Sequence, residues 1–166
     1  MSTQDILNFI AECNKTLPHF PDGRTDYTTA SKCPVINVIV VHQGRVLLLK
    51  RSDKVMAYKG KWNCIGGFLD EVGPIENKVY EELREELSVL PSLIERTTYI
   101  DPIEVVDSAI NRTWLIQPAL VVLKERPIIT LDWEHTDYAW VAEDEIEKYD
   151  TVMGLDTFIR KALALV

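Results

Sequence analysis

The stretch that most constrains the fold runs from Gly66 to Val89, GGFLDEVGPIENKVYEELREELSV. It opens on two glycines and passes through Gly73 and Pro74, which favour a break in regular structure. Apolar residues then recur every four positions along the chain. They are Ile75, Val79, Leu83 and Leu87. This spacing repeats on one face of a helix, so the stretch predicts an amphipathic helix.

The predicted helix carries a crowded acidic flank. Glu82, Glu85 and Glu86 lie three and four residues apart and therefore project from one side. Like charges at these spacings cost roughly a few tenths of a kcal/mol per pair. A hard divalent cation such as Mg²⁺ binds carboxylate oxygens, water and substrate phosphates. The helix alone leaves two interpretations open, a metal site and the commoner solvated acidic face.

The residues before the helix give a second signal. Trp62 to Ile65 reads as a short strand, and Gly66 and Gly67 follow it directly. We expect the chain to turn sharply at these glycines, so that the Gly66 carbonyl can join the carboxylates. A strand, a glycine turn, a loop and an acidic helix form a specific order.

In this order the residues resemble the Nudix hydrolase family. The family signature is a glycine, five residues, a glutamate, seven residues, an arginine, a glutamate, an aliphatic residue, any residue, two glutamates, any residue, a glycine and an aliphatic residue. Laid on this chain without a gap, it begins at Gly67 and places its last three glutamates on Glu82, Glu85 and Glu86. The part of the signature that binds metal is therefore intact.

Three positions depart from the signature. Its first glutamate is Gly73, its arginine is Glu81, and its late glycine is Ser88. In the family, that glutamate and arginine pair and brace the loop against the helix. Losing both partners lowers stability less than losing one of them, because the loss of one leaves the other as an unpaired buried charge. The sequence leaves open whether Asp70 or Glu71 replaces the brace.

The resemblance also implies a fold and a division of the chain. We expect an α+β domain, a Nudix-like α/β/α sandwich with a mixed β-sheet, over residues 35–166. Residues 1–34 lie outside the resemblance and read as an N-terminal helix and an extended connector rich in proline.

The resemblance implies a metal and a reaction as well. Mg²⁺, or alternatively Mn²⁺, is held by Glu82, Glu85, Glu86 and the Gly66 carbonyl. The reaction is hydrolysis of a phosphoanhydride bond in a nucleoside diphosphate linked to another moiety, with the metal neutralising phosphate oxygens and orienting a water. The substrate is thus a small nucleotide. Many Nudix proteins dimerise, so a homodimer is a further expectation.

Glu134 is a second point of resemblance, independent of the signature. In parts of the family a glutamate six residues before a strand tryptophan closes the metal site or acts as the general base, and Glu134 lies six before Trp140. The alternative is an ordinary surface-loop glutamate. His135 titrates near neutrality, but a lone loop histidine is more often incidental.

Basic and aromatic residues form the expected substrate wall. Arg51 ends a strand near the substrate phosphates in the family, and Tyr58, Lys61 and Trp62 precede the glycine pair. Aromatic rings stack on nucleobases and lysines meet phosphates. Surface solvation of Arg51 and core packing of Trp62 are the alternatives.

Other elements follow from periodicity and turn residues. Pro118 should lie at a bulge or a sheet edge, because proline cannot donate to a ladder. The remaining predictions are a helix through Asn14, a hairpin of Val35–Val41 and Arg45–Leu49, strands Thr97–Val106, Arg112–Leu123 and Tyr138–Val141, and helices Glu143–Tyr149 and Leu155–Leu165.

Composition sets the class of protein. The 166 residues are 46% hydrophobic and 27% charged, which suits one domain with a sizeable core. A net charge of −8 argues against a protein that binds nucleic-acid backbones or anionic membranes. Three cysteines without zinc spacing indicate reduced thiols and a cytoplasmic location, and the first residues resemble neither a signal peptide nor a membrane span.

Three functions stay in view from the sequence. We favour an active Nudix pyrophosphohydrolase. The first alternative is a degenerate Nudix domain that binds a nucleotide or a protein partner without turnover, because Gly73 and Glu81 alter the signature. The second is a Nudix-fold isomerase acting on a diphosphate ester. The three crowded glutamates argue against the binding module.

Overall fold

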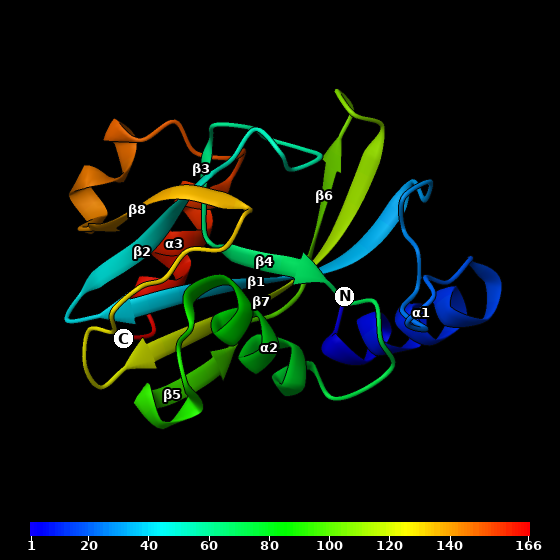
Figure 1. The fold of residues 1–166 in the computed structure, drawn as a ribbon, viewed down its shortest axis with the longest axis horizontal. Coiled ribbons are helices and arrows are strands. Elements are labelled where there is room, and N and C mark those ends of the chain that lie inside the picture. Colours follow the sequence, from blue (N-terminus) through cyan, green and yellow to red (C-terminus); the bar gives the residue numbers. More distant parts are fainter.

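The computed structural model describes residues 1–166 and contains one eight-stranded mixed sheet (Figure 1). Its long central strands, β1 and β7, run parallel, and every other strand pair is antiparallel. The main path is β3-β2-β1-β7-β5, with β4 on β1, β6 on β7 and β8 on β2. The strands are β1 (Lys32–His42), β2 (Arg45–Arg51), β3 (Trp62–Asn63), β4 (Ile65–Phe68), β5 (Ile94–Tyr99), β6 (Ile103–Asp107), β7 (Arg112–Leu123) and β8 (His135–Val141).

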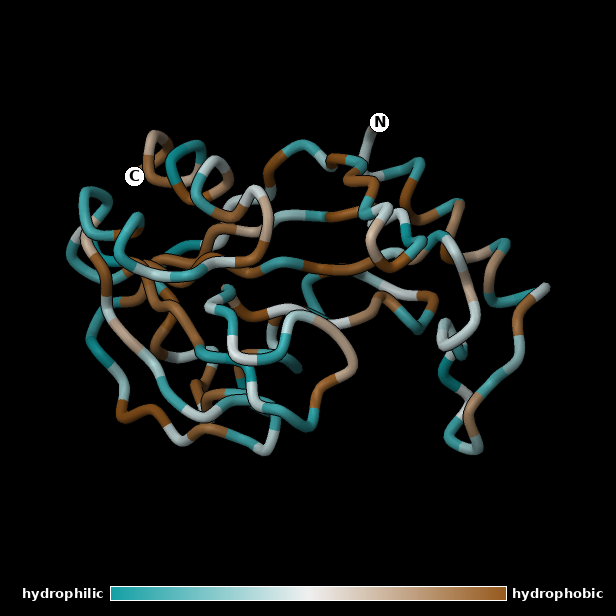
Figure 2. The backbone as a smooth tube through the Cα atoms, turned by 90° about the horizontal axis from the view of Figure 1, so that it is seen from above, coloured by the Kyte–Doolittle hydropathy of each residue, from teal (hydrophilic) through white to brown (hydrophobic).

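Helices cover both faces of this sheet. The helices are α1 (Thr3–Thr16), α2 (Ile75–Leu87) and α3 (Leu155–Leu163), with short 3₁₀ helices η1 (Pro91–Leu93) and η2 (Glu143–Lys148). One buried cluster joins α1 and α2 to the sheet, and a second cluster joins α3 to its opposite face. Apolar residues accordingly concentrate along the central strands (Figure 2). The predicted α/β/α sandwich is confirmed.

The N-terminal helix follows from its sequence. Ser2 caps α1 and forms a capping box with Asp5, and Ile6 and Ile10 are buried against the main core. The helix therefore packs on the same core as α2. The boundary between residues 1–34 and 35–166 stays a prediction.

The predicted glycine turn is wrong. Gly66 and Gly67 lie inside β4 and pair in register with Asn37 and Ile36 of β1. The predicted strand Trp62–Ile65 is accordingly split between β3 and β4. Glycine lacks a Cβ, and that property serves a close approach within a strand as well as it serves a turn.

Two further strand predictions need correction. The stretch Thr97–Val106 forms two strands, β5 and β6, which both pair with β7. Pro118 lies neither at a bulge nor at an edge, since it pairs with Asn37 in the interior of the sheet. Its carbonyl accepts a hydrogen bond from the Ile100 amide at 3.1 Å. The missing N–H points to the same side, at the break between β5 and β6, where no ladder bond is lost.

The remaining elements agree closely with the sequence. The hairpin of β1 and β2 closes through Gln43 and Gly44, which both adopt positive φ, as a tight two-residue turn requires. The predicted helix Glu143–Tyr149 is the 3₁₀ helix η2. None of the helices combines the length and the apolar character needed to cross a membrane.

Candidate functional site

Helix α2 builds the site because its apolar face lies on the sheet and carries two glutamates into the interior. Glu82 is 8% exposed and Glu86 is 3% exposed, one turn apart. The helix ends at Ser88, which adopts the left-handed conformation at φ 57°. The signature has glycine at this position, and glycine adopts that conformation without steric cost.

Glu82 lies between a lysine and a glycine. Its Oε1 atom is 3.0 Å from Lys78 Nζ. A Cβ added to Gly67 would stand 1.9 Å from the same oxygen. The first glycine of the signature is therefore required by the close approach of a buried carboxylate to β4.

The charge of the Glu86 carboxylate is offset by far fewer neighbouring groups than that of Glu82. Its Oε2 atom is buried without a hydrogen-bond partner. Burial raises the pKa of Glu86 well above its usual value, and the neighbouring carboxyl of Glu82 raises it further. His135 Nδ1 lies 3.6 Å from Glu86 Oε2, but burial lowers the pKa of that histidine and favours the neutral ring.

Glu134 joins this group from the end of a neighbouring strand. It directly precedes β8, and its carbonyl accepts a hydrogen bond from the Ser52 amide at 2.7 Å. Burial raises the pKa of Glu134, the nearby Asp132 carboxylate raises it further, and Arg51 opposes the shift. The charge of Glu134 also contributes to the raised pKa of Glu86. The structure thus brings Glu134 to the helix carboxylates.

Glu85 lies apart from the others. Its side chain is 57% exposed, and Arg84 is its ion-pair partner at 3.8 Å. The helical spacing places it on the flank of Glu82 and Glu86, yet the sheet covers only those two. The role of Glu85 as a metal ligand stays a prediction.

The donors present fit a hard cation. No group of three or more His, Cys, Asp or Glu side chains is arranged to hold a metal ion. Mg²⁺ typically takes one or two carboxylates and completes its shell with water and substrate phosphates. Glu82 and Glu86 supply oxygen donors, and the unpartnered Oε2 of Glu86 suits a cation.

The predicted substrate residues fall into two groups. Arg51 lies close enough to Glu134 to influence its pKa, and its Nε atom donates to the Ala57 carbonyl at 3.0 Å. The other three make contacts within the protein. The Tyr58 hydroxyl donates to Asp107, Lys61 pairs with Asp150 at 2.6 Å, and the Trp62 ring packs edge-on against Tyr149 at 4.9 Å. Their contact with substrate stays a prediction.

Three residues around the carboxylates were not predicted as site residues. Lys78 lies four residues before Glu82, a spacing that predicts their ion pair. His135 is buried because β8 pairs with β2 up to Arg51, which no local pattern reveals. Asp132 accepts from the Glu134 amide at 3.0 Å and lies 3.3 Å from His135 Nδ1, and it shapes the turn before β8.

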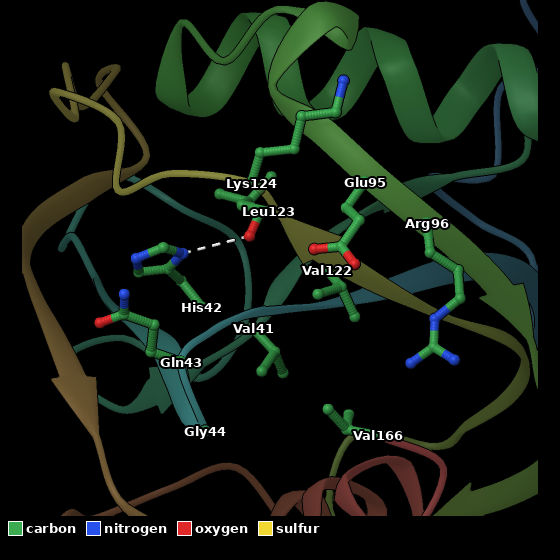
Figure 3. A pocket seen from close by; sticks show the side chains of 10 residues that line it. All are labelled: Val41, His42, Gln43, Gly44, Glu95, Arg96, Val122, Leu123, Lys124 and Val166. Atoms are coloured by element: carbon green, nitrogen blue, oxygen red, sulfur yellow. Dashed lines mark hydrogen bonds between the residues drawn. The ribbon is translucent and has the colours of Figure 1, made fainter.

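A cavity of about 480 Å³ lies elsewhere, at the turn between β1 and β2 (Figure 3). His42 is held there by a hydrogen bond to the Leu123 carbonyl, and the Lys124 side chain points away. None of the predicted site residues lines it. The carboxylate cluster is therefore the better candidate for the functional site.

Known proteins resemble this chain over most of its length. A nucleoside triphosphatase NudI of Salmonella newport is 30% identical over 138 residues, which cover 80% of this chain and 92% of that protein. The NudI protein of Escherichia fergusonii is 28% identical over the same shares. The chain therefore resembles these relatives over nearly their whole length.

Solved structures give the same result. A MutT NUDIX hydrolase from Burkholderia pseudomallei superposes with a TM-score of 0.61 at 28% identity and covers 81% of this chain and 98% of that one. The NUDIX domain of Shewanella oneidensis NrtR, complexed with ADP ribose, has a TM-score of 0.68 at 15% identity over 99% of both chains, and so shares the fold. The family model described as NUDIX domain matches residues 32–162. The chain belongs to the Nudix family of hydrolases.

Proposed function

We propose that this protein is a Mg²⁺-dependent pyrophosphohydrolase whose substrate is a nucleoside diphosphate linked to another moiety. A nucleoside triphosphate is the first substrate to test, because the NudI relatives are named nucleoside triphosphatases. Mn²⁺ is the proposed substitute for Mg²⁺. Hydrolysis of a small nucleotide follows from the family.

One observation carries the proposal. Two buried carboxyl groups, Glu82 and Glu86, meet on α2, and the Oε2 atom of Glu86 has no hydrogen-bond partner. Uncompensated buried carboxylates are costly for stability, so they indicate a cation or a function. A bound divalent cation supplies neutralisation of phosphate oxygens and a more acidic water.

The chain's own residues complete the proposed chemistry. Glu134 is the proposed general base, because its raised pKa improves its match to a proton transfer near neutrality. Arg51 beside it offers a positive charge to a phosphate. Glu85 and the Gly66 carbonyl are proposed as further ligands, and Tyr58, Lys61 and Trp62 as contacts of the nucleoside.

Two features extend the proposal beyond the site. All three cysteines are free and buried, which supports a cytoplasmic location. A homodimer stays a prediction from the resemblance.

The second candidate function is nucleotide binding without turnover, which the altered positions Gly73 and Glu81 favour. The isomerase alternative stays a prediction from the family.

A substrate panel tests the proposal. Purified protein is offered nucleoside triphosphates, dinucleotides, ADP-ribose and nucleotide sugars with and without Mg²⁺, and phosphate-containing products are measured. We expect Mg²⁺-dependent cleavage of at least one member and its loss in Glu85→Gln. Glu125→Gln, an exposed glutamate outside the site, is the matched control. Saturable binding without cleavage would replace hydrolysis with the binding function.

A further inference from the structure

The loop between β4 and α2 lacks the brace that the family signature supplies. A Cβ added to Gly73 would meet nothing within 4 Å, so the position of the missing glutamate faces open space. A cavity of about 410 Å³ runs along this loop and the first turns of α2. Glu81, at the position of the missing arginine, is an acidic residue of its lining. Neither position rebuilds the brace.

Lys78 occupies the centre of this region. Its Nζ atom lies 2.8 Å from Glu81, 3.0 Å from Glu82 and 3.6 Å from Asp70 of the loop. Its side chain is only 13% exposed. Burial lowers the pKa of Lys78, but the three surrounding carboxylates outweigh it and raise the pKa overall, so the ammonium stays charged. One lysine therefore joins the loop to a metal-site carboxylate.

Asp70 is the loop partner of this lysine. It is 6% exposed, and its Oδ1 atom has no hydrogen bond apart from the ionic contact with Lys78. Its Oδ2 atom lies 3.5 Å from Arg24, a residue of the segment before β1. Its carbonyl accepts from the Thr25 amide at 2.9 Å. The N-terminal segment therefore contacts both the side chain and the backbone of Asp70.

Neighbouring contacts hold that segment against the same loop. The Tyr27 hydroxyl donates to the Leu69 carbonyl at 3.3 Å, and its ring stacks on Phe68 with centroids 5.7 Å apart. Asn14, near the end of α1, donates to the Thr25 hydroxyl at 3.3 Å. The path from α1 to the loop is continuous, and it runs through residues that precede the matched domain 32–162.

We propose that Lys78 is a positioning residue that holds the Glu82 carboxylate, and that the contact of Asp70 with Lys78, supported by Arg24, replaces the glutamate–arginine brace of the family. The polarity of the family brace is kept, because the acid still lies on the loop, two residues after β4, and the base still lies on α2, one turn before Glu82. Residues 18–27 thereby become part of the site's support. The effect of Lys78 on turnover rests on the proposed hydrolysis, whereas the brace between the loop and α2 does not.

Hydrogen exchange tests the brace without any activity. In Lys78→Met, the amides of residues 69–73 should exchange at least about tenfold faster, since the loop loses its anchor to α2. Amides of β1 should keep their protection. Lys78→Arg should restore slow exchange, and Lys161→Met, an exposed lysine on α3, should leave the loop unchanged. Unchanged loop exchange in Lys78→Met would overturn the brace.

Arg24→Gln is the second variant, and it addresses the N-terminal segment separately. Arg24 is 43% exposed, so we expect Arg24→Gln to fold even where Lys78→Met does not. We expect about two- to fivefold faster exchange in the loop. Arg45→Gln, which breaks a surface pair with Glu145, is the matched control. Equal effects of the two arginine variants on the loop would remove Arg24 from the proposal.

Turnover distinguishes positioning from mere support. Lys78→Met should lower kcat by about 10- to 100-fold with KM within twofold. Restoring the family pair with Gly73→Glu and Glu81→Arg should recover most of that loss and slow loop exchange again. An unchanged kcat, or a loss that the restored pair fails to relieve, would overturn the positioning role. If the wild-type protein cleaves no substrate while Lys78→Met still speeds loop exchange, the proposed function is overturned and the brace stands.

Discussion

Glu82 and Glu86 lie one turn apart on the same buried face of α2, and they differ in what offsets their charge. Lys78 lies 3.0 Å from Glu82 and also binds the neighbouring Glu81 and the loop. The nearest basic group to Glu86 is His135 at 3.6 Å, whose lowered pKa favours the neutral ring. The helix therefore contains one compensated and one uncompensated carboxylate.

The difference separates a structural need from a functional one. A buried ion pair such as Lys78–Glu82 satisfies its members without any ligand, although it contributes little net stability. A buried carboxyl without such a partner lowers stability until something positive binds. Under the proposed function, Glu86 is therefore the position where the fold gives up stability for a cation.

The largest expected effect is on turnover in Glu86→Gln. Glutamine keeps the shape but removes the charge, so hydrolysis should fall at least about 100-fold, at the upper end of the losses that follow removal of groups supporting a metal site. Steady-state cleavage of the substrate identified by the panel measures it. Glu125→Gln should retain full rate, and a fully active Glu86→Gln would remove Glu86 from the site.

Gly67→Ala should have the next largest effect, and it acts on the compensated member of the pair. The new Cβ would stand 1.9 Å from Glu82 Oε1, so the carboxylate must move away from Lys78 or β4 must shift. We expect a loss of about 1–3 kcal/mol in the free energy of unfolding. Chemical denaturation measures it.

Gly73→Ala is the control for that change. Nothing lies within 4 Å of the added Cβ there, and the residue does not adopt positive φ. Its stability should stay the same or rise by about 0.4–1 kcal/mol. Equal destabilisation by the two alanines would show that Gly67 is not specially constrained by Glu82.

The smallest expected effect comes from Ser88→Gly, just beyond the two carboxylates. Ser88 has φ 57°, and its amide bonds back to the Arg84 carbonyl at 3.0 Å. Glycine adopts this conformation without strain, so the unfolding free energy should rise by about 0.5–1 kcal/mol. Ser88→Ala should bring no such gain. A gain in both variants would point to the lost hydroxyl instead of the backbone.

Local pattern was sufficient for α2 and β7, and the resemblance to the family supplied the sandwich. A period of four apolar residues predicts the helix, and a long apolar run predicts the strand. The same pattern could not separate Glu85 from Glu82 and Glu86, because helical spacing groups all three and only the sheet decides which are covered. The acidic flank of α2 was therefore predictable, and the burial of Glu82 and Glu86 was not.

Other misses share one cause, which is contact between distant parts of the chain. His135 is covered because β8 pairs with β2, and Asp70 is covered because residues 24–27 fold back on its loop. The glycine pair misled for a different reason. A glycine that avoids a side chain and one that turns the chain look alike in sequence, and only the position of Glu82 tells them apart.

The most direct measurement is the free energy of unfolding of Glu82→Gln and Glu86→Gln in chelator and then in Mg²⁺. Without cation, Glu82→Gln should lose about 1 kcal/mol with its Lys78 contact, whereas Glu86→Gln should gain about 1 kcal/mol as an unpaired buried charge disappears. Mg²⁺ at a hundred times its Kd should add about 2.7 kcal/mol to the wild type and much less to either variant. Shifts of the same sign in chelator, or equal stabilisation of Glu86→Gln and wild type by Mg²⁺, would contradict a cation site at these two carboxylates.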